Sequence, residues 1–216
     1  MSTYLPTTVA GSYPMVWDYH GKYKPLVRAI RDSLGEFVGG GEPLGQMSDI
    51  LVANAVLDQL FASAGLSPQP GNSSYTEDDL PRLAGQGLDI VSTGQHRLTL
   101  DGNMCIPALR CFDGVTIRRE EGAHLARIER EARLNEARFR ETLLRDFAVA
   151  NATLDLVNSR IPNVVEHKRL KLAFTGPLTM LWGEGTVYPA DTDEALIEHF
   201  SDGIVRMVDM VRDGNL

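Results

Sequence analysis

The sequence contains only two cysteines, Cys105 and Cys111, among 216 residues. Two thiols are too few for a disulfide framework, so the sequence predicts a protein of a reducing compartment, the cytoplasm. Long apolar runs are also missing: no stretch reaches the roughly 18 apolar residues of a membrane span. Residues 1–6 have neither the basic nor the apolar region of a signal peptide. We therefore expect a soluble protein that makes no contact with a membrane.

The sequence also has few positively charged residues relative to negatively charged ones. The 21 Lys and Arg residues are outnumbered by 29 Asp and Glu residues, which gives a formal net charge of -8. Nucleic-acid binding needs a dense Lys/Arg surface that displaces counterions, so a nucleic-acid partner is not expected. Hydrophobic residues make up 43% of the chain and charged residues 23%. This mixture is typical of an ordinary globular protein, and the length fits one domain.

Three apolar segments that each run into a polar loop with a glycine predict β-strands, in residues 7–14, 88–97 and 170–177. Apolar residues at helical spacing predict helices at residues 24–37, 48–65, 76–85 and 192–211. Residues 120–159 are rich in Ala, Leu, Glu and Arg, which favours one long helix or two helices there. The first half of this segment is highly charged, and we expect it to face solvent or a partner.

Strands separated by long helical segments are typical of parallel βαβ units, in which the functional loops follow the carboxyl ends of the strands. The sequence therefore predicts an α/β fold. A closed (β/α)₈ barrel needs eight strands and about 250 residues. With only three strands, the predicted architecture is an incomplete TIM-type barrel that a partner chain or a missing carboxyl-terminal half would complete.

The three loops together resemble those of a known family. Residues 5–14 (LPTTVAGSYP) are similar to the opening of the catalytic domain of cobalamin-independent methionine synthases. Residues 94–97 (GQHR) resemble the family's second loop, a Gly-Glu pair followed shortly by Arg. Residues 175–182 (TGPLTMLW) resemble its Thr-Gly-Pro-Val-Thr segment with a nearby Trp. All three matches occur in the family's order and span most of the chain.

The resemblance implies a (β/α)₈ barrel in which a zinc ion activates the thiol of homocysteine to take a methyl group from a methyltetrahydrofolate-type donor. It assigns contacts with the amino-acid substrate to Gly11 and Ser12, and stacking on a pterin ring to Trp182. The other substrate-binding residues that it implies are Gln95, His96, Arg97, Thr175 and Gly176. Gln95 departs from the family, which has a Glu that holds the substrate's amino group. A neutral amide does not pair with an ammonium as a carboxylate does.

The family's zinc ligands are a His-x-Cys pair, a Glu and a distant Cys, and the resemblance places all of them beyond residue 216. No His-x-Cys occurs in this sequence. Cys105 and Cys111 with His96 match none of the usual zinc spacings, so two reduced thiols are the simpler interpretation. We therefore expect zinc to be held outside this chain.

Three hypotheses remain open on the sequence alone. The chain is a subunit of a split thiol methyltransferase, or a portion of a longer single-chain enzyme, or a non-catalytic binding or regulatory protein on the same scaffold. Within the enzyme hypotheses, the acceptor is homocysteine or another small thiol. An open barrel would leave an unpaired strand and an uncovered apolar face, and a second protein chain is the partner that would close them.

Overall fold

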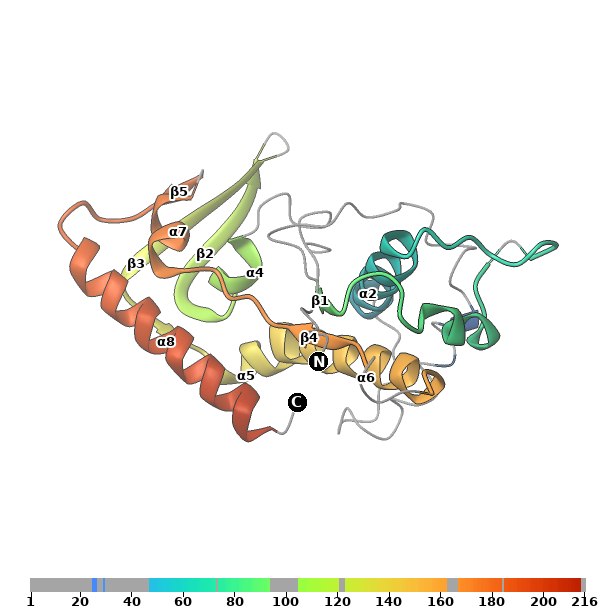
Figure 1. Ribbon diagram of the computed structural model, residues 1–216. Coiled ribbons are helices and arrows are strands. Elements are labelled where there is room, and N and C mark those ends of the chain that lie inside the picture. The colour runs from blue at the N-terminus through green and yellow to red at the C-terminus, as the bar shows by residue number, and fades with distance from the viewer. Residues whose placement is uncertain are drawn as a thin grey trace. The chain divides into compact units, whose positions relative to one another are not determined.

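A computed structural model of the chain describes residues 25–26, 29, 47–72, 74–93, 105–120, 123–162, 167–183 and 185–214. The chain divides into two compact units, drawn in Figure 1. The first unit takes Met1–His96 and Asp146–Leu172, and the second takes Arg97–Arg145 and Ala173–Leu216. The chain thus enters each unit twice, whereas the sequence predicts one domain.

The first unit contains a two-stranded parallel sheet of β1 (Ile90–Ser92) and β4 (Arg169–Lys171). The register places Ile90 opposite Arg169 and Ser92 opposite Lys171. Its helices are α2 (Met47–Ser63), the 3-10 helix η1 (Glu77–Leu83) and α6 (Arg145–Arg160), whose first residue belongs to the second unit. Both strands occupy segments in which the sequence predicts strands.

Helix α2 is the central helix of the first unit's core. Its side chains are buried at every position from 51 to 61, because apolar residues occur on all sides of this helix. It ends in a Schellman motif: Gly65 has φ +63°, and the Leu66 amide donates to the Phe61 carbonyl at 3.0 Å. The Phe61 ring also stacks on the Tyr75 ring, with centroids 3.9 Å apart. The rest of the core comes from η1, β1 and α6, including Leu80, Leu83, Val91, Val149, Leu154 and Val157.

The second unit contains a three-stranded sheet in the order β2–β3–β5. Strand β2 (Phe112–Glu120) pairs antiparallel with β3 (Ala123–Leu134), and β3 pairs parallel with the short β5 (Thr186–Val187). The long helix α8 (Asp193–Asp213) packs against β3 and against α7 (Pro177–Trp182). Three further helical turns are α4 (Ile106–Leu109), α5 (Glu136–Phe139) and the π-helical η2 (Arg140–Leu144).

The sheet and α8 meet at two aromatic rings. Phe112 and Phe200 are both buried, and their rings meet edge to face with centroids 4.7 Å apart. Gly203 lies one helical turn after Phe200, and a Cβ added to it would lie 2.6 Å from Cε1 of Phe112. The missing side chain therefore lets the ring pack directly against the helix backbone.

The prediction of helix throughout residues 120–159 is wrong for residues 123–134, which form β3; the long helical segment begins only at Glu136. Ala, Glu and Arg favour a helix, but intrinsic propensity is a weak preference that tertiary pairing overrides. The alternating burial of Ala126 and Ile128 between exposed Leu125, Arg127 and Glu129 is the period-two pattern of a strand. Only Glu121 and Gly122 separate β3 from β2 in the sequence, a spacing that fits a hairpin.

The fold is therefore mixed α/β, as the sequence predicts, with two small sheets and no closed barrel among the described residues. The strand predicted in residues 7–14 lies outside the described residues. Within the parts of the chain that the structure describes, none of the helices has the length and the apolar character needed to cross a membrane.

Candidate functional site

The carboxyl ends of β1 and β4 lie at the same edge of the first unit's sheet, because the two strands are parallel and in register. Strand β1 ends at Ser92 and is followed by Thr93; both side chains are buried. In open α/β sheets, ligands bind at this end of the strands. The next residues in the sequence are Gly94 and the predicted site residues Gln95, His96 and Arg97, which lie outside the described residues, as do Gly11 and Ser12.

A buried glutamine holds the carboxyl end of β1 in place. Gln59 of α2 accepts a hydrogen bond from the Ser92 amide at 3.0 Å and donates one to the Ser92 carbonyl at 2.7 Å. The Ser92 hydroxyl lies 3.3 Å from the same Gln59 oxygen. The side-chain amide thus pairs with both backbone groups of Ser92, as a neighbouring strand would. Local sequence patterns do not reveal this contact, because Gln59 and Ser92 lie 33 residues apart in the sequence.

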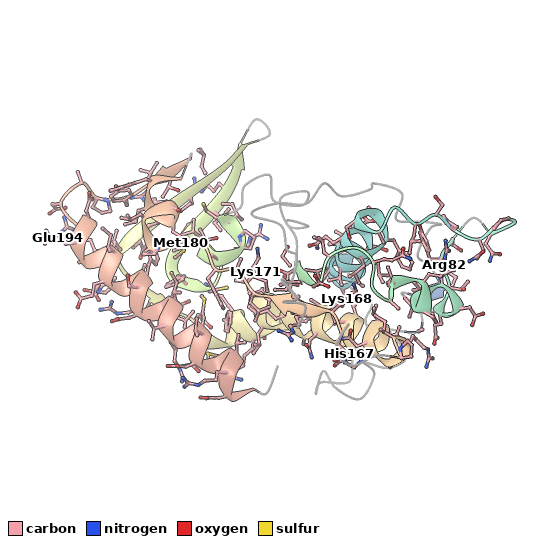
Figure 2. All side chains as sticks on the ribbon, in the orientation of Figure 1. Arg82, His167, Lys168, Lys171, Met180 and Glu194 are labelled. Atoms are coloured by element: carbon pink, nitrogen blue, oxygen red, sulfur yellow. The ribbon has the colours of Figure 1, made fainter. Side chains whose placement is uncertain are left out.

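A buried lysine secures the start of β4 (Lys168, labelled in Figure 2). Its Nζ donates to the Gln86 carbonyl at 2.6 Å. Its backbone amide donates to the Asn158 side chain at 2.7 Å, and the Asn158 amide donates back to the Lys168 carbonyl at 2.9 Å. The strand is therefore tied to the end of α6 and to the segment that follows η1. These contacts fix the position of β4 in the sheet.

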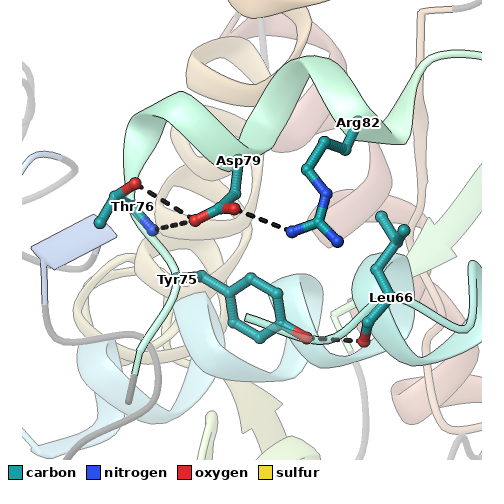
Figure 3. A network of polar contacts seen from close by, with 5 residues as sticks. All are labelled: Leu66, Tyr75, Thr76, Asp79 and Arg82. Atoms are coloured by element: carbon teal, nitrogen blue, oxygen red, sulfur yellow. Dashed lines mark hydrogen bonds and ion pairs between the residues drawn. The ribbon is translucent and has the colours of Figure 1, made fainter. Parts of the chain in front are cut away.

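Another polar network lies at the start of η1 (Figure 3). The Asp79 carboxylate accepts hydrogen bonds from the Thr76 amide at 2.9 Å and from the Thr76 hydroxyl at 3.2 Å, and it pairs with Arg82 at 2.9 Å. Nearby, the Tyr75 hydroxyl donates to the Leu66 carbonyl at 2.7 Å. These bonds close the turn between α2 and η1.

The predicted site residues that the structure describes lie in the second unit, at α7. Gly176 is the exposed residue before this helix, Thr175 before it is half-buried, and the Met180 amide donates to the Gly176 carbonyl at 3.0 Å (Met180 is labelled in Figure 2). Trp182 ends the helix and is 64% exposed, and Leu178, four residues earlier, is 44% exposed. Residues four apart share a helix face, so α7 presents these two side chains together. Trp182 is therefore not a core residue.

The two thiols each lie close to a backbone carbonyl. Cys105 is buried with its Sγ 3.3 Å from the Thr179 carbonyl, and Cys111 is buried with its Sγ 3.3 Å from the Pro107 carbonyl. Burial raises the pKa of the Cys105 thiol, which favours its protonated form. Across the described part of the chain, no three His, Cys, Asp or Glu side chains are placed to hold a metal ion. The described residues thus do not fit a zinc site.

A buried asparagine of α2 has no hydrogen-bond partner among the described residues. Asn54 of α2 is fully buried, and neither its amide nitrogen nor its oxygen makes a hydrogen bond. Such a group costs about 1–3 kcal/mol of stability relative to a satisfied one. Sequence analysis missed it, although a polar residue inside the apolar stripe of a helix is a signal for it.

Comparison of the chain with protein-family models, with curated proteins and with solved structures finds no match.

Proposed function

We propose that this chain carries the substrate-binding part of a methyltransferase similar to the cobalamin-independent methionine synthases. It would transfer a methyl group from a folate-type donor to a thiol such as homocysteine. The observation that supports this most is the parallel pairing of β1 with β4. The second and third family-like motifs follow these two strands in the sequence, and ligands of open α/β sheets bind beyond the carboxyl ends of the strands.

The proposed roles follow the motifs residue by residue. Gly11 and Ser12 would contact the amino-acid part of the acceptor, together with Gln95, His96 and Arg97. Thr175 and Gly176 would contact the substrate through a hydroxyl and an exposed backbone. Trp182 would stack on the flat ring of the donor, and its 64% exposure supports this role because a face of the indole must be free for stacking.

Zinc would come from outside this chain under this proposal, because the family's His-x-Cys pair does not occur in its sequence. When bound by its own ligands, zinc lowers the pKa of a coordinated thiol so that the thiolate exists at neutral pH. A second polypeptide that supplies the ligands would complete the enzyme. The residues of this chain would bind and orient the substrates.

A non-catalytic binding protein on the same scaffold is the alternative, and Gln95 favours it. Where a carboxylate would pair with an ammonium group, the amide offers only a neutral hydrogen bond. The same substitution also fits an enzyme that alkylates a thiol other than homocysteine. The alternatives differ in whether zinc and a second chain are needed.

Co-expression with the product of the neighbouring reading frame is the experiment that separates them. We expect a heteromer of defined stoichiometry by light scattering, with bound zinc by elemental analysis and methyl transfer to a thiol. A folded, zinc-free chain that forms no complex with the neighbouring product would contradict the methyltransferase proposal. It would favour the alternative of a non-catalytic binding protein.

A matched pair of variants tests the role of Trp182 in the complex. Trp182→Ala should weaken binding of 5-methyltetrahydrofolate by about tenfold, since one stacking contact contributes about 1–3 kcal/mol. Val205→Ala removes another exposed apolar side chain of the second unit and should leave this affinity unchanged. Equal effects of the two substitutions would count against a stacking role.

A further inference from the structure

One face of the second unit's sheet carries arginines next to apolar side chains. Thr116, Arg127 and Val187 lie side by side across β2, β3 and β5, and Arg118 lies opposite Leu125 in the next row of the β2–β3 pair. Residues two apart on a strand point to the same side, so these five side chains share one face, which we call the arginine face. Ala126 and Ile128 point to the other side and are buried.

The arginine face lies in a hollow of about 900 Å³, which is also lined by Tyr188 and Pro189 from the segment after β5. This segment is tied to β3 by an ion pair, in which Nη2 of Arg130 donates to both carboxylate oxygens of Asp191, at 2.7 and 2.8 Å. Ligand pockets for small molecules typically have volumes of about 300–1,000 Å³. The hollow therefore has the size of a small-molecule site.

The charge of the hollow is opposite to that of the chain. Arg118 and Arg127 are exposed and form no ion pair with any described residue, whereas Arg130 is neutralised by Asp191. Among the described residues that line the hollow, Glu129 is the only carboxylate. A chain with a net charge of -8 thus concentrates two unpaired guanidinium groups at one place. Guanidinium groups bind carboxylates and phosphates through two parallel hydrogen bonds.

Apolar surface lies beside these cations. Leu125 is 36% exposed and Val187 is 61% exposed, and each is a cross-strand neighbour of an arginine: Leu125 of Arg118, and Val187 of Arg127. A purely inorganic anion would leave this surface in water, whereas a molecule with an apolar part would cover it. Pockets of this kind combine an apolar lining with a few polar groups that fix the ligand's orientation.

We propose that the arginine face binds a small organic anion, with its phosphate or carboxylate group held by Arg118 and Arg127 and its apolar part on Leu125 and Val187. This site lies within the second unit and does not depend on the proposed methyltransferase function. It needs neither zinc nor a second chain. The result of a binding test at the arginine face therefore neither supports nor contradicts the proposed methyltransferase function.

Isothermal titration calorimetry of the whole chain at low salt tests the site, with phenyl phosphate and phenylacetate as probes. Inorganic phosphate and benzyl alcohol are the comparison ligands, because each keeps one half of the proposed interaction. We expect at least one aromatic anion to bind more tightly than both comparison ligands. A preference for phenyl phosphate would assign the natural ligand to phosphate esters, and a preference for phenylacetate would assign it to carboxylates.

Variants of the arginines locate the binding. Arg118→Gln and Arg127→Gln should each weaken the preferred probe by about tenfold, the loss expected for a hydrogen-bonded charge. Arg169→Gln removes the same charge from an exposed position on β4 of the first unit and should leave the affinity unchanged. Melting temperatures of all three variants show whether each remains folded.

Four outcomes would overturn the proposal. Neither aromatic anion binds at millimolar concentration, or benzyl alcohol binds as tightly as the anions, or inorganic phosphate binds as tightly as phenyl phosphate. The fourth is a loss of affinity in Arg169→Gln equal to that in Arg118→Gln, which would indicate general attraction to surface charge.

Discussion

Asp79 is a buried carboxylate whose neighbours keep it ionised. Its side chain is 1% exposed. Burial alone would raise the pKa of Asp79, but hydrogen bonds from the Thr76 amide, Arg82 and the Thr76 hydroxyl outweigh burial and hold the pKa below its ordinary value of 3.8. Because the pKa of Asp79 is lower in the folded state, its ionised carboxylate stabilises the fold at every pH above the ordinary pKa. This stabilisation is lost as the pH falls through the lower pKa of the folded state.

Replacing this carboxylate tests the network. Asp79→Asn should lower the free energy of unfolding of the first unit by about 1–3 kcal/mol at neutral pH, because the amide loses the ion pair and accepts fewer hydrogen bonds. The difference from the unmodified protein should begin to shrink as the pH falls below the ordinary pKa of 3.8, and it should vanish only below the lower pKa that Asp79 has in the folded protein. Urea denaturation at several pH values measures both effects. Asp78→Asn, an exposed neighbour in the same turn, is the control and should have a much smaller effect.

Gly203 is a second residue whose neighbours determine the result of a substitution. In an ordinary helix, Gly→Ala stabilises by about 1 kcal/mol. Here the new Cβ would meet the buried Phe112 ring at 2.6 Å, and Phe200 packs against that ring. We expect Gly203→Ala to destabilise the second unit by about 1–3 kcal/mol.

A double variant checks this cause. If the clash with the ring is responsible, Gly203→Ala combined with Phe112→Leu should cost less in thermal unfolding than the two single substitutions added together. Strict additivity would mean that Gly203 matters for a reason other than the ring.

At the scale of elements, Gln59 joins helix α2 to strand β1 through both backbone groups of Ser92. Gln59→Leu should lower stability by about 1–3 kcal/mol, because it leaves the buried amide and carbonyl of Ser92 without these bonds. Asn54→Leu is the matched control: it lies on the same helix and is also fully buried, but its amide has no partner among the described residues. We expect Asn54→Leu to leave the urea midpoint unchanged or to raise it. A loss as large as that of Gln59→Leu would show that Asn54 has a partner.

The elements also show where sequence reasoning succeeds and where it stops. Helices α2 and α8 lie where apolar periodicity and the end signals Gly65 and Thr192 predict them. Strand β3 was missed because its composition favours a helix, while its pairing with β2 and β5 decides its conformation. Of the predicted site, Trp182 is exposed, and the arginine face was not foreseen because Arg127 falls in a segment for which the sequence predicts a helix.

At the scale of the whole molecule, the two units each have residues from two separate parts of the chain. We expect them to unfold in two calorimetric transitions, because each has its own core. Asp79→Asn should then lower only the transition of the first unit, and Gly203→Ala only that of the second. A single transition that both variants shift equally would show that the units unfold together.

The sequence alone determined the α/β class and the approximate positions of β1, β4, α2 and α8. These features follow from periodicity and end signals within one short stretch of chain, so they are encoded locally. Only the tertiary structure decided that residues 123–134 form a strand, that Gln59 pairs with Ser92 33 residues away, and that Arg118 and Arg127 share a hollow. Hydrogen bonding and burial between distant segments override local preference at these places, and no local pattern contains that information.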